Sequence, residues 1–335
     1  MPQIHIPQGY TSLLSIYETQ KAIGLLNRLF EDKLSGALRL HRVSAPLFVS
    51  STSGLNDDLN GVERPVSFDI NGCQETAVVV HSLAKWKRLA LKRYQFQVGE
   101  GLYTDMNAIR RDEALDALHS AYVDQWDWEK IITKEDRTVD TLKQVVQEVY
   151  QALKKTEKYM AIEYDYIEEI LPKNIFFITS QELEDRYPDC TPKEREYKIA
   201  KLKGAVFIMQ IGGKLKSGLP HDGRAPDYDD WSLNGDIIVY YPVLDIALEL
   251  SSMGIRVDED SLKKQLELAG CPERAELPFQ KAILNKELPY TIGGGIGQSR
   301  ICMFFLRKAH IGEVQASLWP EEETKAAAEH GIELL

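Results

Sequence analysis

The sequence predicts an α+β protein whose helices flank a mixed β-sheet. Segments typical of helices and of strands are interspersed along the 335 residues without the regular β-α-β rhythm of a doubly wound parallel sheet. The most glycine-rich stretch, residues 293–297, lies near the C-terminus, whereas the glycine fingerprint of a dinucleotide-binding fold opens its first β-α unit. Both observations argue against a Rossmann fold. A hydrophobic content of 44% is typical of a globular chain that buries a substantial core.

Two stretches have the periodicity of long amphipathic helices. Residues 12–33 and 138–164 repeat apolar side chains at three- and four-residue intervals. Between them, a polar loop is expected at 50–61, and 78–88 begins apolar and becomes helical. The remaining expected elements are an extended segment at 45–49, strands at 174–179, 205–211, 237–241, 247–257 and 314–319, and helices at 192–203, 260–269, 277–286 and 301–306.

One expected strand alternates strictly between two kinds of side chain. Gln125, Asp127 and Glu129 share one face, and Trp126 and Trp128 share the other. Three hydrogen-bonding side chains cannot face an apolar core, so their face is either solvated or lined by a ligand. The tryptophans on the opposite face favour a central, well-packed strand. A central strand in turn favours a face that is lined by a ligand over one that is solvated.

The glycine run ends at Arg300 and is expected to be a turn that leads into an apolar helix. Glycines let a backbone approach a flat or phosphorylated ligand, and an arginine can lie against an adenine ring and reach a phosphate. The N-terminus of the following helix would favour an anion. A tight packing contact between a strand and a helix explains the same residues equally well.

Composition narrows the class of protein. The net charge of −11 argues against a nucleic-acid partner, since phosphate contacts usually require a basic face. No apolar run approaches the roughly 20 residues that span a bilayer, and the start has no signal-peptide pattern. The four cysteines are scattered without metal-ligand spacing, as in reduced cytosolic proteins. We therefore expect a cytoplasmic small-molecule enzyme that binds neither nucleic acid nor membrane.

Charged residues accompany two later strands. Asp236 precedes one expected strand, and Glu249 and Arg256 flank the core of the next. Acidic groups at such positions can hold Mg²⁺ on a polyphosphate, and an arginine can fork onto a carboxylate.

No cysteine lies near the start or beside an evident catalytic histidine, as a glutamine-dependent amidotransferase would require. Free ammonia is therefore the better nitrogen source for any amide-forming reaction.

Several long strings resemble one known family. Residues 109–129 and 293–300 are similar to the second and third motifs of class II aminoacyl-tRNA synthetases, especially of the aspartate and asparagine branch, with a weaker match to the first motif at 43–46. The closer resemblance, over essentially the whole chain, is to the ammonia-dependent aspartate–ammonia ligases of the asparagine synthetase A family. The strings that carry it are 81–88, 99–104, 122–129, 224–231 and 293–300.

The resemblance implies a fold and a reaction. The fold is a mainly antiparallel mixed sheet in one class II synthetase-like catalytic domain over residues 1–335, without an anticodon-binding domain and as a homodimer. The reaction joins L-aspartate to ammonia with ATP as a substrate and Mg²⁺ as the metal, giving L-asparagine, AMP and pyrophosphate through a β-aspartyl-adenylate. A catalytically silent binding paralogue and aminoacyl transfer to a protein acceptor are the alternatives.

The resemblance also implies residue roles. Arg110 would stabilise charge on the α-phosphate. If aspartate bound as in aspartyl-tRNA synthetase, its α-carboxylate would be activated and asparagine could not form. We therefore expect aspartate to bind in the reversed orientation, with its α-carboxylate on Lys87 and Arg256 and its β-carboxylate facing Arg110. Asp57 would then hold the amino group or receive ammonium. The expected roles are catalytic for Arg110, Asp57 and Gln125, aspartate-binding for Ser82, Lys87, Asp127 and Arg256, ATP-binding for Arg110, Asp229, Asp236, Ser252, Gly293, Gly295, Gly297 and Arg300, and metal-binding for Asp236 and Glu249.

A loop dense in glycine, proline and charge covers residues 214–231. An acyl-adenylate must be shielded from water, so this loop is the candidate lid, with Gly212, Gly213 and Gly218 as hinges. A surface loop laced with salt bridges is the alternative reading.

Overall fold

The computed structural model describes residues 6–56 and 63–335, and its centre is an eight-stranded mixed sheet. The two edge pairs of strands are parallel and the pairs between them are antiparallel, which confirms the expected sheet. In spatial order the strands are β1 (Leu40–Arg42), β5 (Gly101–Ile109), β6 (Tyr122–Ile131), β11 (Thr291–Gly297), β10 (Ile246–Arg256), β9 (Asp229–Tyr241), β8 (Ala205–Met209) and β7 (Phe176–Thr179).

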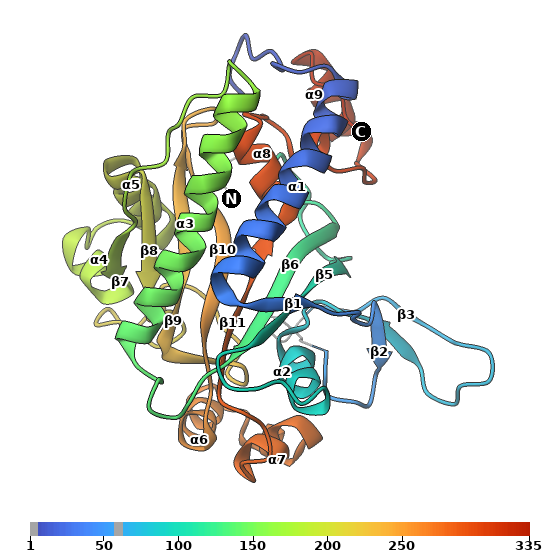
Figure 1. Cartoon of the computed structure of the whole chain (residues 1–335), viewed down its shortest axis with the longest axis vertical. Coiled ribbons are helices and arrows are strands. Elements are labelled where there is room, and N and C mark those ends of the chain that lie inside the picture. The colour runs from blue at the N-terminus through green and yellow to red at the C-terminus, as the bar shows by residue number, and fades with distance from the viewer. Residues whose placement is uncertain (1–5, 57–62) are drawn as a thin grey trace.

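Two long helices lie side by side across one face of this sheet, α1 (Ile16–Leu38) and α3 (Val139–Glu163) (Figure 1). The other helices are α2 (Ala84–Arg93), α4 (Ser180–Arg186), α5 (Pro192–Lys203), α6 (Glu259–Leu268), α7 (Pro278–Leu284), α8 (Gln298–Phe305) and α9 (Glu321–Glu329), with 3₁₀ turns η1 (Pro272–Glu276) and η2 (Ile311–Glu313). A separate three-stranded sheet projects beside β1 in the order β2 (Phe48–Ser50), β4 (Ala77–Val79) and β3 (Ser67–Phe68).

The sequence of α1 explains both its ends and its buried face. Ser15 and Glu18 form a capping box at its start, and Arg39 ends it in the left-handed region with a φ of 59°. Its buried side chains recur about every fourth residue and meet the sheet, where the rings of Phe30 and Trp126 lie 4.8 Å apart. The helix thus covers the tryptophan face of β6.

The alternation in β6 places its two faces as expected. Trp126 and Trp128 are fully buried in the main apolar core, together with residues of α1 and α3. Gln125 and Asp127 point to the opposite face and line a cavity there. One face of the sheet is therefore the core, and the other carries the candidate site.

The expected glycine turn is wrong, because Gly293–Gly297 belong to β11, a strand in the middle of the sheet. It is paired with β6 on one side and β10 on the other. Glycine weakens an isolated strand, but here the neighbouring strands supply the pairing and leave no room for larger residues. A Cβ at Gly294 would lie 2.6 Å from the Cβ of Met253. The helix that follows begins at Gln298, three residues earlier than expected.

The expected strand at 314–319 is also wrong. The chain leaves η2 and runs without strand pairing to Pro320. Side-chain contacts hold it instead, as Ser317 Oγ lies 2.8 Å from Ser120 Oγ in the loop before β6. Among the described residues, no helix has the length and apolar character needed to cross a bilayer.

Candidate active site

A cavity of about 450 Å³ lies against the face of the sheet opposite α1 and α3. Its walls come from β6, β10, β11, the start of α2, the loop before β6 and the segment before β9. The expected residues that line it are Ser82, Lys87, Arg110, Gln125, Asp127, Asp229, Glu249, Ser252, Arg256, Gly295, Gly297 and Arg300. Gly293 and Asp236 lie beside these residues on β11 and β9, and Asp57 falls outside the described residues.

Lys87 occupies the floor of one end of the cavity. Its side chain is fully buried, and Nζ donates to Asp127 Oδ1 at 2.5 Å, to the Trp128 carbonyl at 3.0 Å and to the Gly294 carbonyl at 3.2 Å. An ammonium group has three hydrogens, so these partners satisfy it completely. Helix α2 thus delivers a fixed positive charge to the middle of β6.

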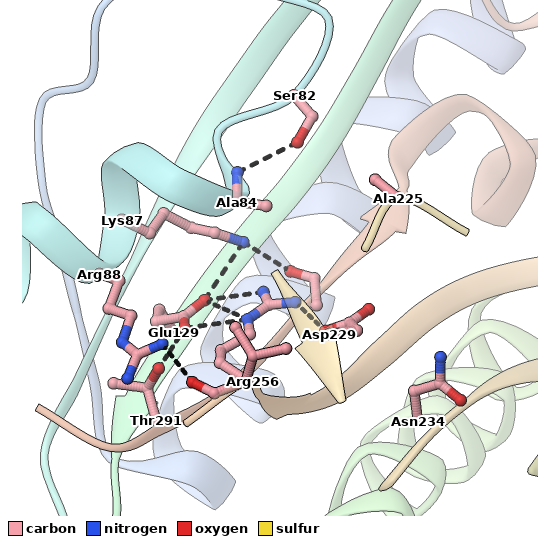
Figure 2. A network of polar contacts seen from close by, with 12 residues as sticks. Ser82, Ala84, Lys87, Arg88, Glu129, Ala225, Asp229, Asn234, Arg256 and Thr291 are labelled. Atoms are coloured by element: carbon pink, nitrogen blue, oxygen red, sulfur yellow. Dashed lines mark hydrogen bonds and ion pairs between the residues drawn. The ribbon is translucent and has the colours of Figure 1, made fainter. Parts of the chain in front are cut away.

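Arg256 forms a second buried cation beside it (Figure 2). Its Nε and Nη2 donate to the two carboxylate oxygens of Glu129 at 2.7–3.1 Å, and its Nη1 pairs with Asp229 Oδ1. Thr291 Oγ donates to Glu129 at 2.6 Å. Burial alone would raise the pKa of Glu129, but the charges of Arg256 and Lys87 outweigh it and hold the pKa below its usual value. The structure places Asp229 here, as the first residue of β9.

The glycines of β11 make room for these side chains. A Cβ at Gly293 would collide with Glu129 Oε2 and lie 2.6 Å from Arg256 Nη2. A Cβ at Gly295 would collide with Gln125 Oε1. None of these glycines has a positive φ, so close approach and not backbone freedom requires them.

The other end of the cavity is rich in arginine. Burial would raise the pKa of Glu249, but the positive charges of Arg300, Arg224, Lys193 and Arg110 hold it below its usual value. Arg300 Nη1 also donates to the Glu249 carbonyl at 3.3 Å. The Nε of Arg110 is buried and has no hydrogen-bond partner among the described residues. Such an end suits a polyphosphate.

Asp236 and Glu249, the expected metal ligands, lie on adjacent strands and interact electrostatically. Burial and the negative charge of Glu249 together raise the pKa of Asp236 to about 6, although the positive charge of Arg224 opposes them. Asp236 Oδ2 pairs with Arg224, and its buried Oδ1 has no partner within the described parts of the chain. No group of three or more His, Cys, Asp or Glu ligands forms in residues 6–56 and 63–335. A metal would need further ligands from a substrate.

The expected lid, 214–231, is anchored unequally along its length. Near its C-terminal end, buried Asp227 accepts from Lys85 Nζ at 2.9 Å and from Gln280 Nε2 at 2.6 Å. Near its N-terminal end, the ion pair between Lys216 and Asp185 is exposed. Ion pairs therefore lace both ends of the loop, one of them buried and one exposed, and its role as a lid stays a prediction.

Two residues of the site were missing from the expected set. Arg224 faces Glu249 and pairs with Asp236, and Glu129 is the main partner of Arg256. Glu129 shares a face with Gln125 and Asp127, so the alternation of β6 was a signal for it. Arg224 belongs to 224–231, one of the segments that carry the family resemblance, but its position in the sequence did not indicate which carboxylate it would pair with.

Residues 17–331 match the family described as aspartate-ammonia ligase. The chain is 65% identical over 336 residues to the aspartate–ammonia ligase of Clostridium perfringens, covering 100% of both chains. It is 62% identical over 327 residues to that of Fusobacterium nucleatum, covering 98% of this chain and 100% of the relative.

Solved structures support the fold. An asparaginyl-tRNA synthetase from Pyrococcus horikoshii complexed with asparaginyl-adenylate matches with a TM-score of 0.62 and 15% identity, over 90% of this chain and 70% of that chain. The asparaginyl-tRNA synthetase of Entamoeba histolytica in complex with asparaginyl-adenylate matches with a TM-score of 0.62 and 12% identity, over 89% and 66%. The fold is that of a class II aminoacyl-tRNA synthetase core, as expected.

Proposed function

The chain belongs to the aspartate–ammonia ligase family, and from this premise we propose that it makes L-asparagine from L-aspartate, ammonia and ATP, with AMP and pyrophosphate as the other products. The proposal rests on one observation, a single cavity whose two ends differ in their charged groups. A buried network around Lys87 and Arg256 forms one end, and arginines around Glu249 form the other. An amino acid and a nucleoside triphosphate need such neighbouring sites to react.

The aspartate end suits a small zwitterion. Arg256 has five N–H groups, of which three serve Glu129 and Asp229, so two remain for a substrate carboxylate. Asp127 offers a carboxylate for the substrate's amino group, and Gln125 and Ser82 line the same cavity. Either carboxylate of aspartate could meet the two N–H groups of Arg256. The reversed orientation, with the α-carboxylate on Arg256 and near the positive charge of Lys87, is the one that leaves the β-carboxylate free to react.

The reaction then proceeds in two steps. An oxygen of the β-carboxylate attacks the α-phosphorus of ATP, and the bond to the pyrophosphate oxygen breaks. Ammonia next attacks the β-carbonyl carbon, and AMP leaves with the oxygen that the carboxylate supplied. Arg110 lines the cavity, and its buried Nε has no hydrogen-bond partner among the described residues. Its guanidinium group can therefore pair with negative charge that develops on the α-phosphate. Such a contact supplies about 2–4 kcal/mol.

Magnesium is part of the proposal. The buried Oδ1 of Asp236, which has no hydrogen-bond partner in residues 6–56 and 63–335, and the nearby carboxylate of Glu249 are hard oxygen ligands of the kind Mg²⁺ prefers. These two residues would hold the ion together with oxygens of the triphosphate. Bound there, Mg²⁺ would neutralise negative charge on the phosphates. Arg224 already pairs with Asp236, so this carboxylate would interact with both the guanidinium group and the metal ion.

Asp57 remains the proposed group for ammonium or for the shifted amino group, although it lies outside the described residues. Asp57→Asn removes the negative charge with little change in size. We expect this variant to release AMP and pyrophosphate slowly and to make almost no asparagine. Wild-type turnover of the variant would remove Asp57 from the mechanism.

We also propose a homodimer that works in the cytoplasm. The start of α1 supports the dimer, because Ile16 is 41% exposed and Tyr17 is 73% exposed there. Light scattering of the purified protein measures the assembly directly. A monomer at working concentration would contradict this part of the proposal.

The test of the function is a product assay with aspartate, ATP and Mg²⁺, with and without ammonium chloride. Asparagine that depends on ammonium and appears in step with AMP is the expected result. AMP without asparagine would instead indicate another acceptor. No nucleotide turnover would favour a catalytically silent binding protein.

A further inference from the structure

One wall of the cavity is neither the aspartate end nor the arginine end. It comprises Leu118 and His119 from the loop before β6, Ile311 from η2, and Gln315 from the segment that follows η2. The Ile311 amide donates to the Ala117 carbonyl at 2.8 Å, which ties the two segments together. Leu118 and Ile311 give this wall apolar surface against which a flat ring can lie.

A chain of hydrogen bonds fixes the side-chain amide of Gln315. Its Nε2 donates to Ser299 Oγ at 2.9 Å, and Ser299 Oγ donates to Asp124 Oδ2 at 2.7 Å. The Ser299 amide also donates to Asp124 Oδ1 at 3.0 Å. An ionised carboxylate only accepts, so the serine hydrogen points to Asp124 and the serine lone pair receives the amide nitrogen. The amide oxygen of Gln315 must therefore face away from Ser299.

That oxygen is unsatisfied. Gln315 is 4% exposed, and its Oε1 is buried without a hydrogen-bond partner in the described part of the chain. A buried acceptor without a donor is unfavourable, and native proteins rarely keep one without a reason. Because Gln315 lines the cavity, a bound molecule with an N–H group can supply the donor.

We propose that Gln315 Oε1 accepts a hydrogen bond from the exocyclic amino group of adenine and thereby selects ATP among purine nucleotides. This inference rests on the proposed function, in which ATP is a substrate. Adenine presents an N–H donor at that position, whereas hypoxanthine and guanine present a carbonyl oxygen. Two acceptors facing each other repel, so the fixed amide would disfavour the carbonyl purines.

The neighbours of Gln315 favour adenine over the other N–H donors in the reaction. Arg300 follows Ser299 directly in α8, so the arginine expected to cover the adenine ring starts beside this wall. Aspartate's amino group carries positive charge, and Asp127, the carboxylate proposed to hold it, lies at the aspartate end. A neutral amide oxygen suits the neutral amino group of adenine better.

The test compares kcat/KM for ATP, inosine triphosphate and purine riboside triphosphate, which lacks a substituent at that position. The wild type should favour ATP over purine riboside triphosphate by about 10- to 100-fold, the effect of leaving a buried acceptor unpaired. In Gln315→Met the preference should shrink to about threefold or less, and discrimination against inosine triphosphate should weaken.

Gln280→Met is the matched control. Gln280 is also buried, its Nε2 donates to Asp227, and its Oε1 is likewise unpartnered among the described residues, but it does not line the cavity. Its substitution should leave the ratio between the purine substrates unchanged, whatever happens to stability. A ratio that shifts equally in both variants would contradict the proposal.

Ser299→Ala tests the same chain of bonds if Gln315→Met fails to fold. Without the serine oxygen the amide can turn its nitrogen toward the base, so inosine triphosphate should gain relative to ATP. If the wild type makes asparagine and neither variant alters purine selectivity, the inference about Gln315 is wrong and the function stands. If the wild type makes none, the function fails, and calorimetric binding of ATP and inosine triphosphate decides the inference alone.

Discussion

The two ends of the cavity differ in how far the protein itself satisfies its charged groups. At the aspartate end, Lys87 is buried with all three ammonium hydrogens engaged by the chain, and Arg256 is buried and paired with two carboxylates. In and beside the rest of the cavity, Arg110, Asp236 and Gln315 each keep a buried atom without a partner among the described residues. We propose that the first end is largely organised before substrate arrives and that the nucleotide completes the rest.

This difference predicts opposite consequences for equivalent substitutions. A buried charge that loses its partner destabilises the fold, whereas a charge that only awaits a ligand affects binding and catalysis. Stability and activity should therefore separate between the two ends. The following variants test that separation, from the largest effect to the smallest.

Arg256→Gln should unfold the protein most easily. It leaves Glu129 and Asp229 buried without their main positive partner, at a cost of about 3–5 kcal/mol in the free energy of unfolding. Urea denaturation measures the loss. Arg300→Gln is the control, since among the described residues Arg300 has one hydrogen bond, to the Glu249 carbonyl, and interacts with the charge of Glu249. Equal stability of the two variants would contradict the proposed difference between the two ends of the cavity.

Arg110→Gln should reduce activity and spare the fold. Its only ion pair among the described residues, to Glu113, is 3.9 Å long and partly exposed. We expect kcat to fall by about 10²- to 10³-fold, as when a donor to a developing oxyanion is removed. The free energy of unfolding should change by less than about 0.5 kcal/mol. A large loss of stability would show that Arg110 is as fully engaged as Arg256.

Gly293→Ala should disturb the aspartate end through volume alone. The added Cβ would collide with Glu129 and lie 2.6 Å from Arg256 Nη2, so we expect a loss of about 1–3 kcal/mol in thermal or urea unfolding. Gly297→Ala is the matched control, because its nearest neighbour would be Arg300 Cβ at 3.4 Å. A tolerated alanine at Gly293 would mean that the buried pair can shift at little cost.

Asp236→Asn should have the smallest effect, and one that depends on pH. Burial raises the pKa of Asp236 to about 6, so between about pH 4 and pH 6 the folded state keeps a proton that the unfolded chain has released. The stability that this carboxyl contributes therefore falls as the pH rises through that window. Asp236→Asn also removes the partner of Arg224, a cost that does not vary with pH in this range. Without nucleotide, the melting temperature of the variant relative to the wild type should therefore rise by a few degrees between pH 4.5 and pH 7. A difference that does not change with pH would contradict the assignment.

Local patterns in the sequence were enough to predict much of the fold. A period of two separates the tryptophans of β6 from Gln125 and Asp127, and a helical period marks α1 and α3. The resemblance to the family placed Lys87 and Arg256 in one site, and both line the cavity. The two periodicities depend only on residues close together in the chain.

Long-range contacts explain what local patterns missed. The glycines of β11 resemble a turn, yet the side chains that exclude a Cβ there come from β6 and β10, more than a hundred and about forty positions earlier. Arg256 is 127 positions from Glu129, so its partner could not be read from spacing. Residues 314–319 have a strand-like pattern, but they pair with no strand among the described residues, and the contact of Ser317 with Ser120 comes from almost two hundred positions away.

The most direct measurement supplies aspartate labelled with ¹⁸O only in its β-carboxylate and determines the mass of the AMP formed in the presence of ammonium. The account predicts one ¹⁸O atom in the phosphate of each AMP, because the β-carboxylate oxygen attacks the α-phosphorus and leaves with AMP. Unlabelled AMP formed together with asparagine would contradict both the β-aspartyl-adenylate and the reversed orientation of aspartate on Lys87 and Arg256.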